Sequence, residues 1–361
     1  MISFENIFYG KTILITGHNG FKGTWLSLWL NKLGANVIGV SLPEDEGNHH
    51  FSQLNVDVKE YFCDIRNVDG LRKIFLESQP EAVFHLAAQS LVRPSYKDPL
   101  ETWSTNVMGT ANVLEMCRLT DTVKAVLIVT SDKCYENREW RWGYREVDRL
   151  GGHDPYSASK ACCELVTKSY RDAFPHDRTA GLIASARAGN VIGGGDWAVD
   201  RLIPDVMRAI RNNEEMIIRS PHSTRPWQHV LEPLSGYLML VKKLLEGQVE
   251  YSAAWNFGPG DQSNRTVLEV VEQLNLNFPT LKLAINENEN EKVHEAGLLK
   301  LDSSKSNDIL LWKSVWGWQS ALEYTANWYI SNFSNSSSIS SDQIEAYTKD
   351  ALNAKSSWVC E

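Results

Sequence analysis

The feature that most constrains the fold of this chain is a set of evenly spaced glycines that directly follows a short apolar segment. Lys11–Thr16 has the composition of a buried parallel strand, and Gly17, Gly20 and Gly23 come next. Trp25–Leu33 then has the apolar spacing of a helix. In this arrangement, backbone N–H groups at the helix N-terminus can bind a dinucleotide pyrophosphate. The spacing is Gly-x-x-Gly-x-x-Gly, so the motif alone also allows a glycine turn without a ligand.

Apolar strands and amphipathic helices alternate through the first half of the chain. We expect strands at Ile13–Thr16, Asn36–Val40, Glu60–Cys63, Ala82–Leu86, Ala125–Thr130 and Gly181–Ala184. We expect helices at Trp25–Leu33, Val68–Leu76, Thr105–Arg118 and Ser157–Ala173. This order predicts an α/β fold with a doubly wound, parallel, Rossmann-type sheet, in which ligands lie at the carboxyl ends of the strands.

The regular alternation stops after Asn190. Loops rich in Gly, Pro and Trp then separate short helices expected at Leu202–Arg211, Pro233–Leu245 and Thr266–Leu276. We therefore expect a dinucleotide-binding domain over residues 1–190 that carries the catalytic residues. Residues 191–330 are expected to form mainly a smaller mixed α/β substrate lobe, with some strands returning to the main sheet. Residues 331–361 contain a Ser-rich segment and are expected to form a polar, flexible tail with a weak terminal helix.

Two short segments carry groups suited to proton transfer. Tyr156 and Lys160 are four residues apart, so on a helix they lie on one face, where the ammonium lowers the pKa of the phenol. Ser131, Asp132 and Lys133 follow the strand expected at 125–130. Alcohol–ketone redox chemistry needs only a hydroxyl, the Tyr and the Lys. The additional acid and ammonium therefore indicate additional proton transfers; the competing interpretation is a surface ion pair.

These motifs resemble those of the extended short-chain dehydrogenase/reductase family over about residues 11–330. Thr16–Gly23 is similar to the family's cofactor turn, Cys63–Arg66 to its adenine-contacting segment, His85–Gln89 to its nicotinamide-side strand, and Asn106–Thr110 to the helix that supports the active site. The resemblance implies NAD as cofactor. The cofactor-binding residues that it implies are Gly17, His18, Asn19, Gly20, Phe21, Gly23, Asp64, Ile65, Leu86, Ala87, Ala88, Asn106, Tyr156 and Lys160.

Within that family, Thr130–Lys133 and the following Cys134–Asn137 are most similar to the 4,6-dehydratases of CDP-sugars, as are Arg141–Glu146 and Gly193–Trp197. The resemblance implies conversion of CDP-D-glucose to CDP-4-dehydro-6-deoxy-D-glucose and water, in dideoxyhexose and lipopolysaccharide synthesis. Tyr156 would take the proton of the 4-hydroxyl, which Ser131 positions. Asp132 would protonate the leaving 6-hydroxyl. Lys133 would act at carbon 5, either as a base or as an electrostatic stabiliser of the enolate.

A nucleotide-sugar substrate also requires groups that contact its diphosphate and sugar. The resemblance assigns Gln89, Ser131, Asn190, Arg201 and Arg225 to substrate binding, with Arg225 suited to a bidentate phosphate contact. Arg201, with Arg208 and Arg265, is a weaker candidate, because each of these is on its own more typical of a solvated surface charge. His85 lies inside an apolar strand and is expected to be a core histidine.

The loop after the second strand bears on the choice between NAD and NADP. Ser41 stands where the usual ribose-binding acid is expected, and Glu44, Asp45 and Glu46 follow with no Arg or Lys nearby. A 2′-phosphate would therefore meet only negative charge, which favours NAD. The acidic run itself is more typical of a solvated loop than of a direct ribose contact.

Composition excludes several other classes of protein. The net charge is −9 without a long basic block, so nucleic acid is not an expected partner. No apolar run approaches the ~20 residues that span a bilayer, and no signal sequence is recognised, so we expect a cytoplasmic protein without a membrane partner. The six cysteines have no metal-ligand spacing, and no metal is expected. The helices at Thr105–Arg118 and Ser157–Ala173 resemble those that pair in family dimers, which implies a homodimer or higher homo-oligomer.

Three alternatives remain open at this point. A nucleotide-sugar 4-epimerase would use the same cofactor and Tyr/Lys pair without needing Asp132 and Lys133. A dehydratase of dTDP-glucose or GDP-mannose would share the mechanism but would differ in its base pocket. A non-catalytic NAD-sensing protein is also possible on this scaffold, although such proteins usually lose the Tyr or the Lys.

Overall fold

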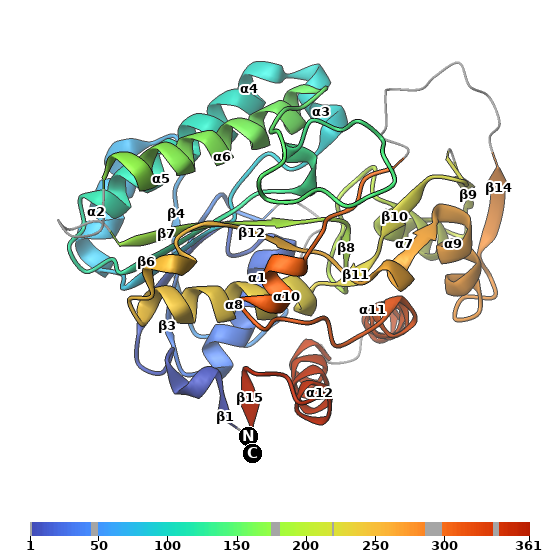
Figure 1. Cartoon of the computed structure of the whole chain (residues 1–361). Helices are drawn as coiled ribbons and strands as arrows, with labels where there is room; N and C mark the ends of the chain where they lie inside the picture. Colours follow the sequence, from blue (N-terminus) through green and yellow to red (C-terminus); the bar gives the residue numbers. More distant parts are fainter. Residues whose placement is uncertain (1, 45–49, 175–180, 219, 286–297, 335–338) are drawn as a thin grey trace.

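The centre of the molecule is a parallel sheet of seven strands (Figure 1). The structure is a computed structural model and describes residues 2–44, 50–174, 181–218, 220–285, 298–334 and 339–361. The strand order is β12-β7-β6-β5-β2-β3-β4. The strands are β2 (Thr12–Thr16), β3 (Asn36–Ser41), β4 (Val58–Phe62), β5 (Ala82–His85), β6 (Ala125–Val129), β7 (Leu182–Ala188) and β12 (Ala254–Phe257). The doubly wound sheet expected from the sequence is confirmed.

Both faces of the sheet are covered, because successive side chains on each strand point to opposite sides. In β2, Leu14 belongs to the apolar cluster under α2 and α5, whereas Ile13 and Ile15 belong to the cluster under α1 and α8. The direction of winding changes between β2 and β5, which are neighbours. Their carboxyl ends therefore flank the crevice in which doubly wound sheets bind ligands.

The helices of the first half follow the sequence pattern closely. They are α1 (Phe21–Lys32), α2 (Val68–Ser78), α3 (Val92–Lys97), α4 (Pro99–Trp103), α5 (Gly109–Arg118) and α6 (Pro155–Ala173). A π-helical segment, η2 (Ser104–Met108), separates α4 from α5, so the single helix expected over 105–118 begins irregularly. Short 3₁₀ turns occur at η1 (Phe4–Asn6), η3 (Asp132–Cys134), η5 (Val249–Tyr251) and η6 (Asp261–Ser263).

The N-termini of α6 and α1 are completed in different ways. Asp154 caps α6, with its Oδ1 accepting a hydrogen bond from Ser157 N at 2.9 Å, and Pro155 occupies the first helical position. In contrast, α1 begins after Gly20 with no side-chain cap. The backbone N–H groups of its first turn are thus left to a ligand or solvent.

The second lobe is built from three short strand pairs and several helices. The pairs are β8 (Val191–Ile192) with β11 (Gln228–His229), β10 (Thr224–Pro226) with β13 (Asn264–Thr266), and β9 (Glu215–Ile218) with β14 (Lys282–Ile285). The helices of this part of the chain are α7 (Leu202–Asn212), α8 (Leu231–Leu245), α9 (Val267–Asn275), α10 (Ser304–Asp308) and α11 (Trp318–Phe333). Its β12 and α8 belong to the main sheet and its cover, so residues 191–330 are not an independent unit.

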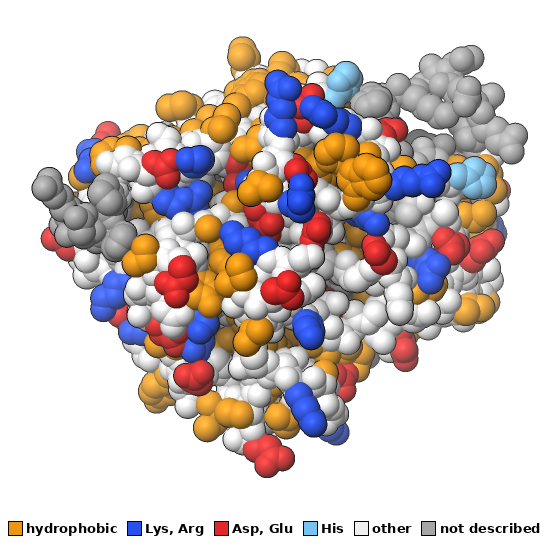
Figure 2. Space-filling model, in the orientation of Figure 1, with side chains coloured by type: hydrophobic (Ala, Val, Ile, Leu, Met, Phe, Trp, Pro, Cys, Tyr) orange, Lys and Arg blue, Asp and Glu red, His pale blue; other side chains and the backbone are white. Residues whose placement is uncertain are grey.

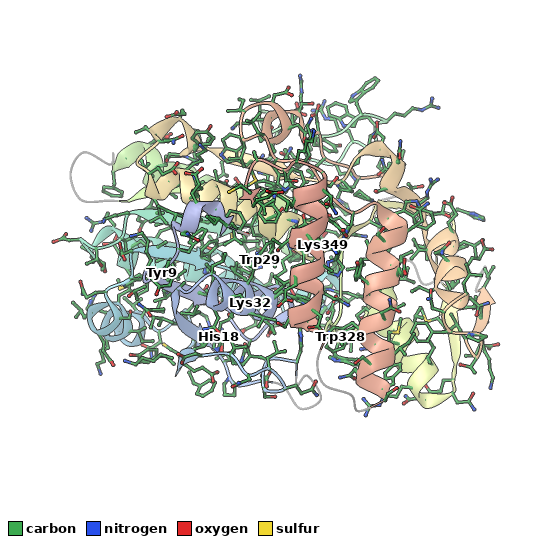
Figure 3. The ribbon with its side chains drawn as sticks, turned by 90° about the horizontal axis from the view of Figure 1, so that it is seen from below. Tyr9, His18, Trp29, Lys32, Trp328 and Lys349 are labelled. Atoms are coloured by element: carbon green, nitrogen blue, oxygen red, sulfur yellow. The ribbon has the colours of Figure 1, made fainter. Side chains whose placement is uncertain are left out.

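Residues 331–361 do not form the polar tail expected from their composition. Beyond residues 335–338, which lie outside the described part, α12 (Ser340–Asn353) packs beside α1. Figure 3 shows Trp29 and Lys32 of α1 beside the helix that carries Lys349. The strand β15 (Val359–Cys360) then pairs with β1 (Ile2–Ser3). Within the described residues, no helix is long and apolar enough to cross a membrane.

A single buried carboxylate connects this C-terminal segment to the helix under the sheet. Glu232, in the first turn of α8, is completely buried. It accepts hydrogen bonds from Trp316 N (2.7 Å), Val315 N (2.9 Å) and Tyr347 Oη (2.8 Å). Burial raises the pKa of Glu232 to about 7, although these donors oppose the increase. Near neutral pH, the interior therefore holds this group close to its titration midpoint.

Replacement of Glu232 by Gln should change stability in a pH-dependent way. The pKa of Glu232 is about 7 in the folded state and 4.5 in the unfolded state, so between these pH values only the folded protein keeps the proton. The free energy of unfolding of the wild type, relative to that of Glu232→Gln, should therefore fall as the pH rises from 4.5 to 7. A shift of this size corresponds to about 3 kcal/mol. Urea unfolding followed by tryptophan fluorescence at pH 5 and pH 8 measures the difference. A gap between the two proteins that is the same at both pH values would contradict this assignment.

Candidate functional site

A cavity of about 1300 Å³ extends along the carboxyl ends of the strands and into the second lobe. Its wall includes the glycine turn, the loops after β3 and β5, the segment after β6, the start of α6 and residues 188–212. Single small-molecule sites usually occupy about 300–1,000 Å³. This cavity has room for a dinucleotide and a second nucleotide side by side.

The glycine turn forms the cavity wall between β2 and α1. Gly17 has a φ of +73°, and a Cβ there would lie 2.8 Å from Ala87 N. A Cβ on Gly23 would lie 1.9 Å from Gly17 O, so only glycine lets the helix start this close to the turn. The uncapped N-terminus of α1 therefore lies at the cavity with Gly20 and Phe21 in its wall. This geometry fits a pyrophosphate.

The loop after β3 forms one end of the cavity and contains two buried oxygens without a partner. They are Ser41 Oγ and Glu44 Oε1, and both residues line the cavity. At the same end, Asp64 holds Arg66 in a two-point ion pair (2.6 and 3.0 Å), so this guanidinium is neutralised. Orphaned acceptors next to a paired cation fit the hydroxyls of an adenosine ribose better than they fit a phosphate. For Glu44, which is partly buried in the cavity wall, the choice between a solvated loop and a ribose contact stays a prediction, and Asp45 and Glu46 lie outside the described residues.

The proton-transfer residues come together at the centre of the cavity. Ser131 caps the η3 turn after β6, with its Oγ accepting from Lys133 N (3.2 Å) and donating to Asp132 Oδ1 (2.9 Å). Tyr156, in the first turn of α6, is hydrogen-bonded to Ser131. Lys160 is one turn further along the same helix, and all five residues line the cavity.

Burial dominates the electrostatics of these groups. It raises the pKa of Tyr156 to about 12, although the hydrogen bond with Ser131 and the charge of Arg201 oppose it. The lowered phenol pKa expected from the Tyr/Lys pair is thus not a property of the chain by itself. Burial also raises the pKa of Asp132, against the effect of Lys133, which favours a carboxyl that holds a proton. It lowers the pKa of Lys160.

Asn106, Gln89 and His85 use their side chains for hydrogen bonds within the protein. Asn106 is buried and bridges two elements, because its Nδ2 donates to Gln89 O (3.0 Å) and to Ser159 Oγ (2.8 Å). The Gln89 side chain is in the cavity wall but donates to Leu91 O and Thr102 Oγ1. His85 bonds with Thr16 and Thr110 and has a pKa of about 3 because of burial, as expected for a core histidine.

His18 is placed differently from its expected role as a cofactor contact. Its ring packs against Phe51 and Gly39, and its Nε2 lies 2.9 Å from Glu60 Oε2. The side chain points under β3 and is not part of the cavity wall. Asn19 lies in the wall and donates to Leu42 O at 2.8 Å, which ties the glycine turn to the loop after β3. The other predicted cofactor contacts, Asp64, Ile65, Leu86, Ala87 and Ala88, line the cavity.

The second lobe contributes several polar groups to the opposite wall. Asn190 and Arg225 line it, the latter from β10. Arg201 donates to Asp196 Oδ2 (3.0 Å) and to Ser90 Oγ (3.3 Å), and its charge acts on Tyr156. Arg201 is therefore closer to the proton-transfer residues than its weak sequence signal suggested. Arg208 also lines the cavity, where its donors are used by Trp197 O and Ala198 O.

Sequence reasoning missed several charged residues of the cavity wall, namely Lys22, Arg93, Glu101, Asp200 and Arg211. Lys22 lies inside the glycine turn, between Gly20 and Gly23, and its side chain lines the cavity. The available signal was an ammonium group between two glycines of the turn, next to the apolar Phe21.

Comparisons with known proteins agree with this geometry. Residues 14–323 match the family model described as GDP-mannose 4,6 dehydratase. A CDP-glucose 4,6-dehydratase of Salmonella typhimurium is 47% identical over 331 residues, covering 90% of this chain and 92% of that protein. The fold is similar to an epimerase of Methanothermobacter thermautotrophicus (TM-score 0.79, 23% identity, 91% and 95% of the two chains). It is also similar to a dTDP-glucose 4,6-dehydratase of Streptomyces venezuelae solved with NAD (TM-score 0.76, 20% identity, 90% and 98%).

The extent of these matches settles membership. The family model covers most of the chain, and the relative from Salmonella is aligned along nearly its whole length. The sheet, the glycine turn and the clustered proton-transfer residues are consistent with these matches. The chain belongs to the GDP-mannose 4,6-dehydratase family of nucleotide-sugar enzymes.

Proposed function

We propose that this protein is an NAD-dependent nucleotide-sugar 4,6-dehydratase that converts CDP-D-glucose to CDP-4-dehydro-6-deoxy-D-glucose and water. The observation that carries the proposal is the presence of Asp132 and Lys133 beside Ser131 and Tyr156 in one cavity. Epimerases share the fold, so the fold alone does not separate the two activities. The additional acid and ammonium do separate them, because only dehydration needs a proton removed at carbon 5 and a proton delivered to the departing 6-hydroxyl.

The residues of the cavity suit NAD. Gly17, Gly20 and the first turn of α1 would hold its pyrophosphate, and Ser41 with Glu44 would face its adenosine ribose. When bound, its nicotinamide supplies a reversible acceptor for the hydrogen of carbon 4. The dehydration has no net redox change, so the same hydrogen is returned to the sugar at carbon 6, and carbon 5 takes back a proton in that step.

The chain's own groups provide the proton transfers. Tyr156, hydrogen-bonded to Ser131, receives the proton of the 4-hydroxyl, and Lys160 lies one turn further along α6. The ketone formed at carbon 4 acidifies the hydrogen at carbon 5, and Lys133 lies in the wall to remove it or to stabilise the enolate. Asp132, whose pKa burial raises, protonates the 6-hydroxyl so that it leaves as water.

The second lobe would bind the nucleotide diphosphate. We assign Arg225 and Asn190 to the diphosphate and Arg201 to the sugar side, because Arg201 is coupled to Tyr156. Gln89 would contribute through the shape of the wall, since its amide is already bonded. A reducing cytoplasm suits this protein, because its six cysteines form no disulfide. This activity would place it in dideoxyhexose synthesis for lipopolysaccharide.

We further propose a homodimer formed through α5 and α6. These helices pack together, and apolar side chains stand exposed around them, namely Leu165 (54% exposed), Met108 (57%) and Leu100 (78%). Hydrophobic side chains also gather along the upper edge of Figure 2, over these helices. Exposed apolar patches of this kind mark interfaces.

The substrate assignment predicts the outcome of a panel of sugar nucleotides. Purified protein with NAD should convert CDP-glucose to a product with the alkali-induced ultraviolet absorbance of a 4-keto-6-deoxy sugar. dTDP-glucose, UDP-glucose and GDP-mannose should react at least about 10²-fold more slowly, because the base pocket discriminates among them. Formation of a CDP-4-epimer without loss of water would instead identify an epimerase.

Lys133→Met should separate the two halves of the reaction. With CDP-glucose, oxidation at carbon 4 should proceed while elimination stalls, so that single-turnover absorbance of reduced nicotinamide accumulates and steady-state turnover falls about 10²–10⁴-fold. Exchange of the carbon 5 hydrogen with deuterated water should fall in parallel. Tyr156→Phe is the matched control, blocked earlier, and should show neither signal while still binding CDP-glucose. Normal turnover of the Lys133→Met protein would make Lys133 an ordinary surface charge.

Leu165→Glu should convert the dimer to monomers in sedimentation velocity, because a carboxylate would be buried in the apolar interface. Leu276→Glu places the same change at an exposed position at the end of α9 and should leave the dimer intact. A wild-type protein that sediments as a monomer would refute the assembly.

A further inference from the structure

Lys22 occupies an unusual position for a charged side chain. It is the second residue of α1, its side chain is half-buried, and it lines the cavity. Its Nζ lies 3.4 Å from the Tyr237 hydroxyl and 5.7 Å from the centre of that ring. Among the described residues, no carboxylate lies within ion-pair distance of it, whereas Arg201 and Arg208 of the same cavity are each paired with an Asp.

The surroundings of Lys22 disfavour its positive charge. The N-terminus of a helix carries a partial positive charge of its own. Burial and the cations Arg201 and Lys160 lower the pKa of Lys22 to about 7, and only Asp132 opposes them. Because these surroundings destabilise the charged form of Lys22, we infer that the ammonium acts on a bound ligand, and that the charge of this ligand changes during the reaction.

The charges that act on Lys22 also show which part of the cavity it faces. Lys160 and Asp132 belong to the group around Tyr156, where the proposed function places the reacting end of the cofactor. Resting on that proposed function, the ligand there is a nicotinamide. This ring is a cation when oxidised and is uncharged when reduced, so a nearby ammonium disfavours the oxidised form.

We propose that Lys22 sets the redox balance of the bound nicotinamide by stabilising the reduced, uncharged ring relative to the oxidised cation. Arg201 is less suited to this role, because Asp196 compensates its charge at 3.0 Å. Lys160 is needed beside Tyr156. Lys22 contributes positive charge to the same part of the cavity, and it belongs neither to the Arg201–Asp196 ion pair nor to the Tyr156/Lys160 pair.

The reaction explains why a lysine suits this position better than an arginine. A 4,6-dehydration uses its cofactor in both directions, first accepting hydrogen from carbon 4 and later returning it to carbon 6. A permanent, strong positive charge would favour the first step and impede the second. An amine that titrates near pH 7 keeps the two forms closer in energy.

The test compares the affinities of the protein for NAD⁺ and NADH, measured by calorimetry after any co-purified cofactor has been released. Lys22→Met removes the charge and keeps most of the length, and at pH 6 it should reduce the preference for NADH over NAD⁺ by about tenfold. For a two-electron couple, that change equals ~30 mV in the potential of the bound cofactor. Lys22→Arg should retain the preference at pH 6, and Lys22→Gln repeats the test if the Met variant folds poorly.

A matched control comes from the same helix. Lys32 is in the last turn of α1 and pairs with Glu345 on the protein surface. Lys32→Met removes an equal charge far from the cavity and should leave the ratio of the two affinities unchanged.

The pH dependence adds a second readout. The groups that face Lys22 are Tyr237 on α8, Lys160 on α6, Asp132 after β6, and Arg201 before α7. In the wild type the preference for NADH should fall as the pH rises from 6 to 8.5, because Lys22 loses its proton in this range. In Lys22→Met the part of this fall that is due to Lys22 should disappear, and only the pH dependence caused by the other groups should remain.

Three results would overturn the proposal. An unchanged affinity ratio in Lys22→Met would mean that Lys22 does not act on the nicotinamide. Equal weakening of both cofactors would make it a phosphate or packing contact. Failure of the wild type to bind either cofactor would refute the proposed NAD-dependent function, and this inference with it.

Discussion

The geometry of the site depends on one buried ion pair, between Arg187 of β7 and Glu164 of α6. Both side chains are almost completely shielded from water and meet at 2.8 Å. Glu164 also accepts hydrogen bonds from Thr130 and Ser185, so both carboxylate oxygens are satisfied. Arg187 donates to Tyr135, which in turn donates to Asn256 of β12. A buried charge is tolerated only when it is paired and bonded in this way.

The ion pair matters for the site because its partners lie next to the proton-transfer residues in the sequence. Thr130 directly precedes Ser131, and Glu164 is one helical turn beyond Lys160. The network therefore fixes the start of α6 relative to the end of β6. If α6 turned or slid on the sheet, Glu164 would lose partners in a place where water cannot replace them, which costs several kcal/mol. Tyr156 and Lys160 are held against Ser131, Asp132 and Lys133 by this constraint, together with the hydrogen bond between Tyr156 and Ser131.

The sequence predicted the sheet and the central residues well, because both depend on local patterns. β6, bounded at Ala125–Val129, is a continuous apolar run, and glycine spacing marks the turn after β2. β7 was predicted too short, since Ser185 and Arg187 interrupt its apolar run, and the carboxylate that satisfies them is distant in sequence. The same limit explains the position of the His18 side chain. Whether a polar side chain points into a cavity or under a strand is decided by tertiary neighbours, here Glu60 and Phe51 for His18. The packed C-terminal segment was missed because its composition is polar, although Ile344, Tyr347 and Trp358 are buried.

The pairing of β1 with β15 has a consequence for how the chain folds during synthesis. Phe4 stacks on Trp358, and Trp29 of α1 packs against both Trp358 and Tyr347. The partners of the first strand are thus translated more than 300 residues after it. Until they emerge from the ribosome, the apolar outer face of α1 has nothing to cover it, and α1 begins at the glycine turn. The nucleotide-binding half is therefore expected to reach its final packing only after translation of residue 360.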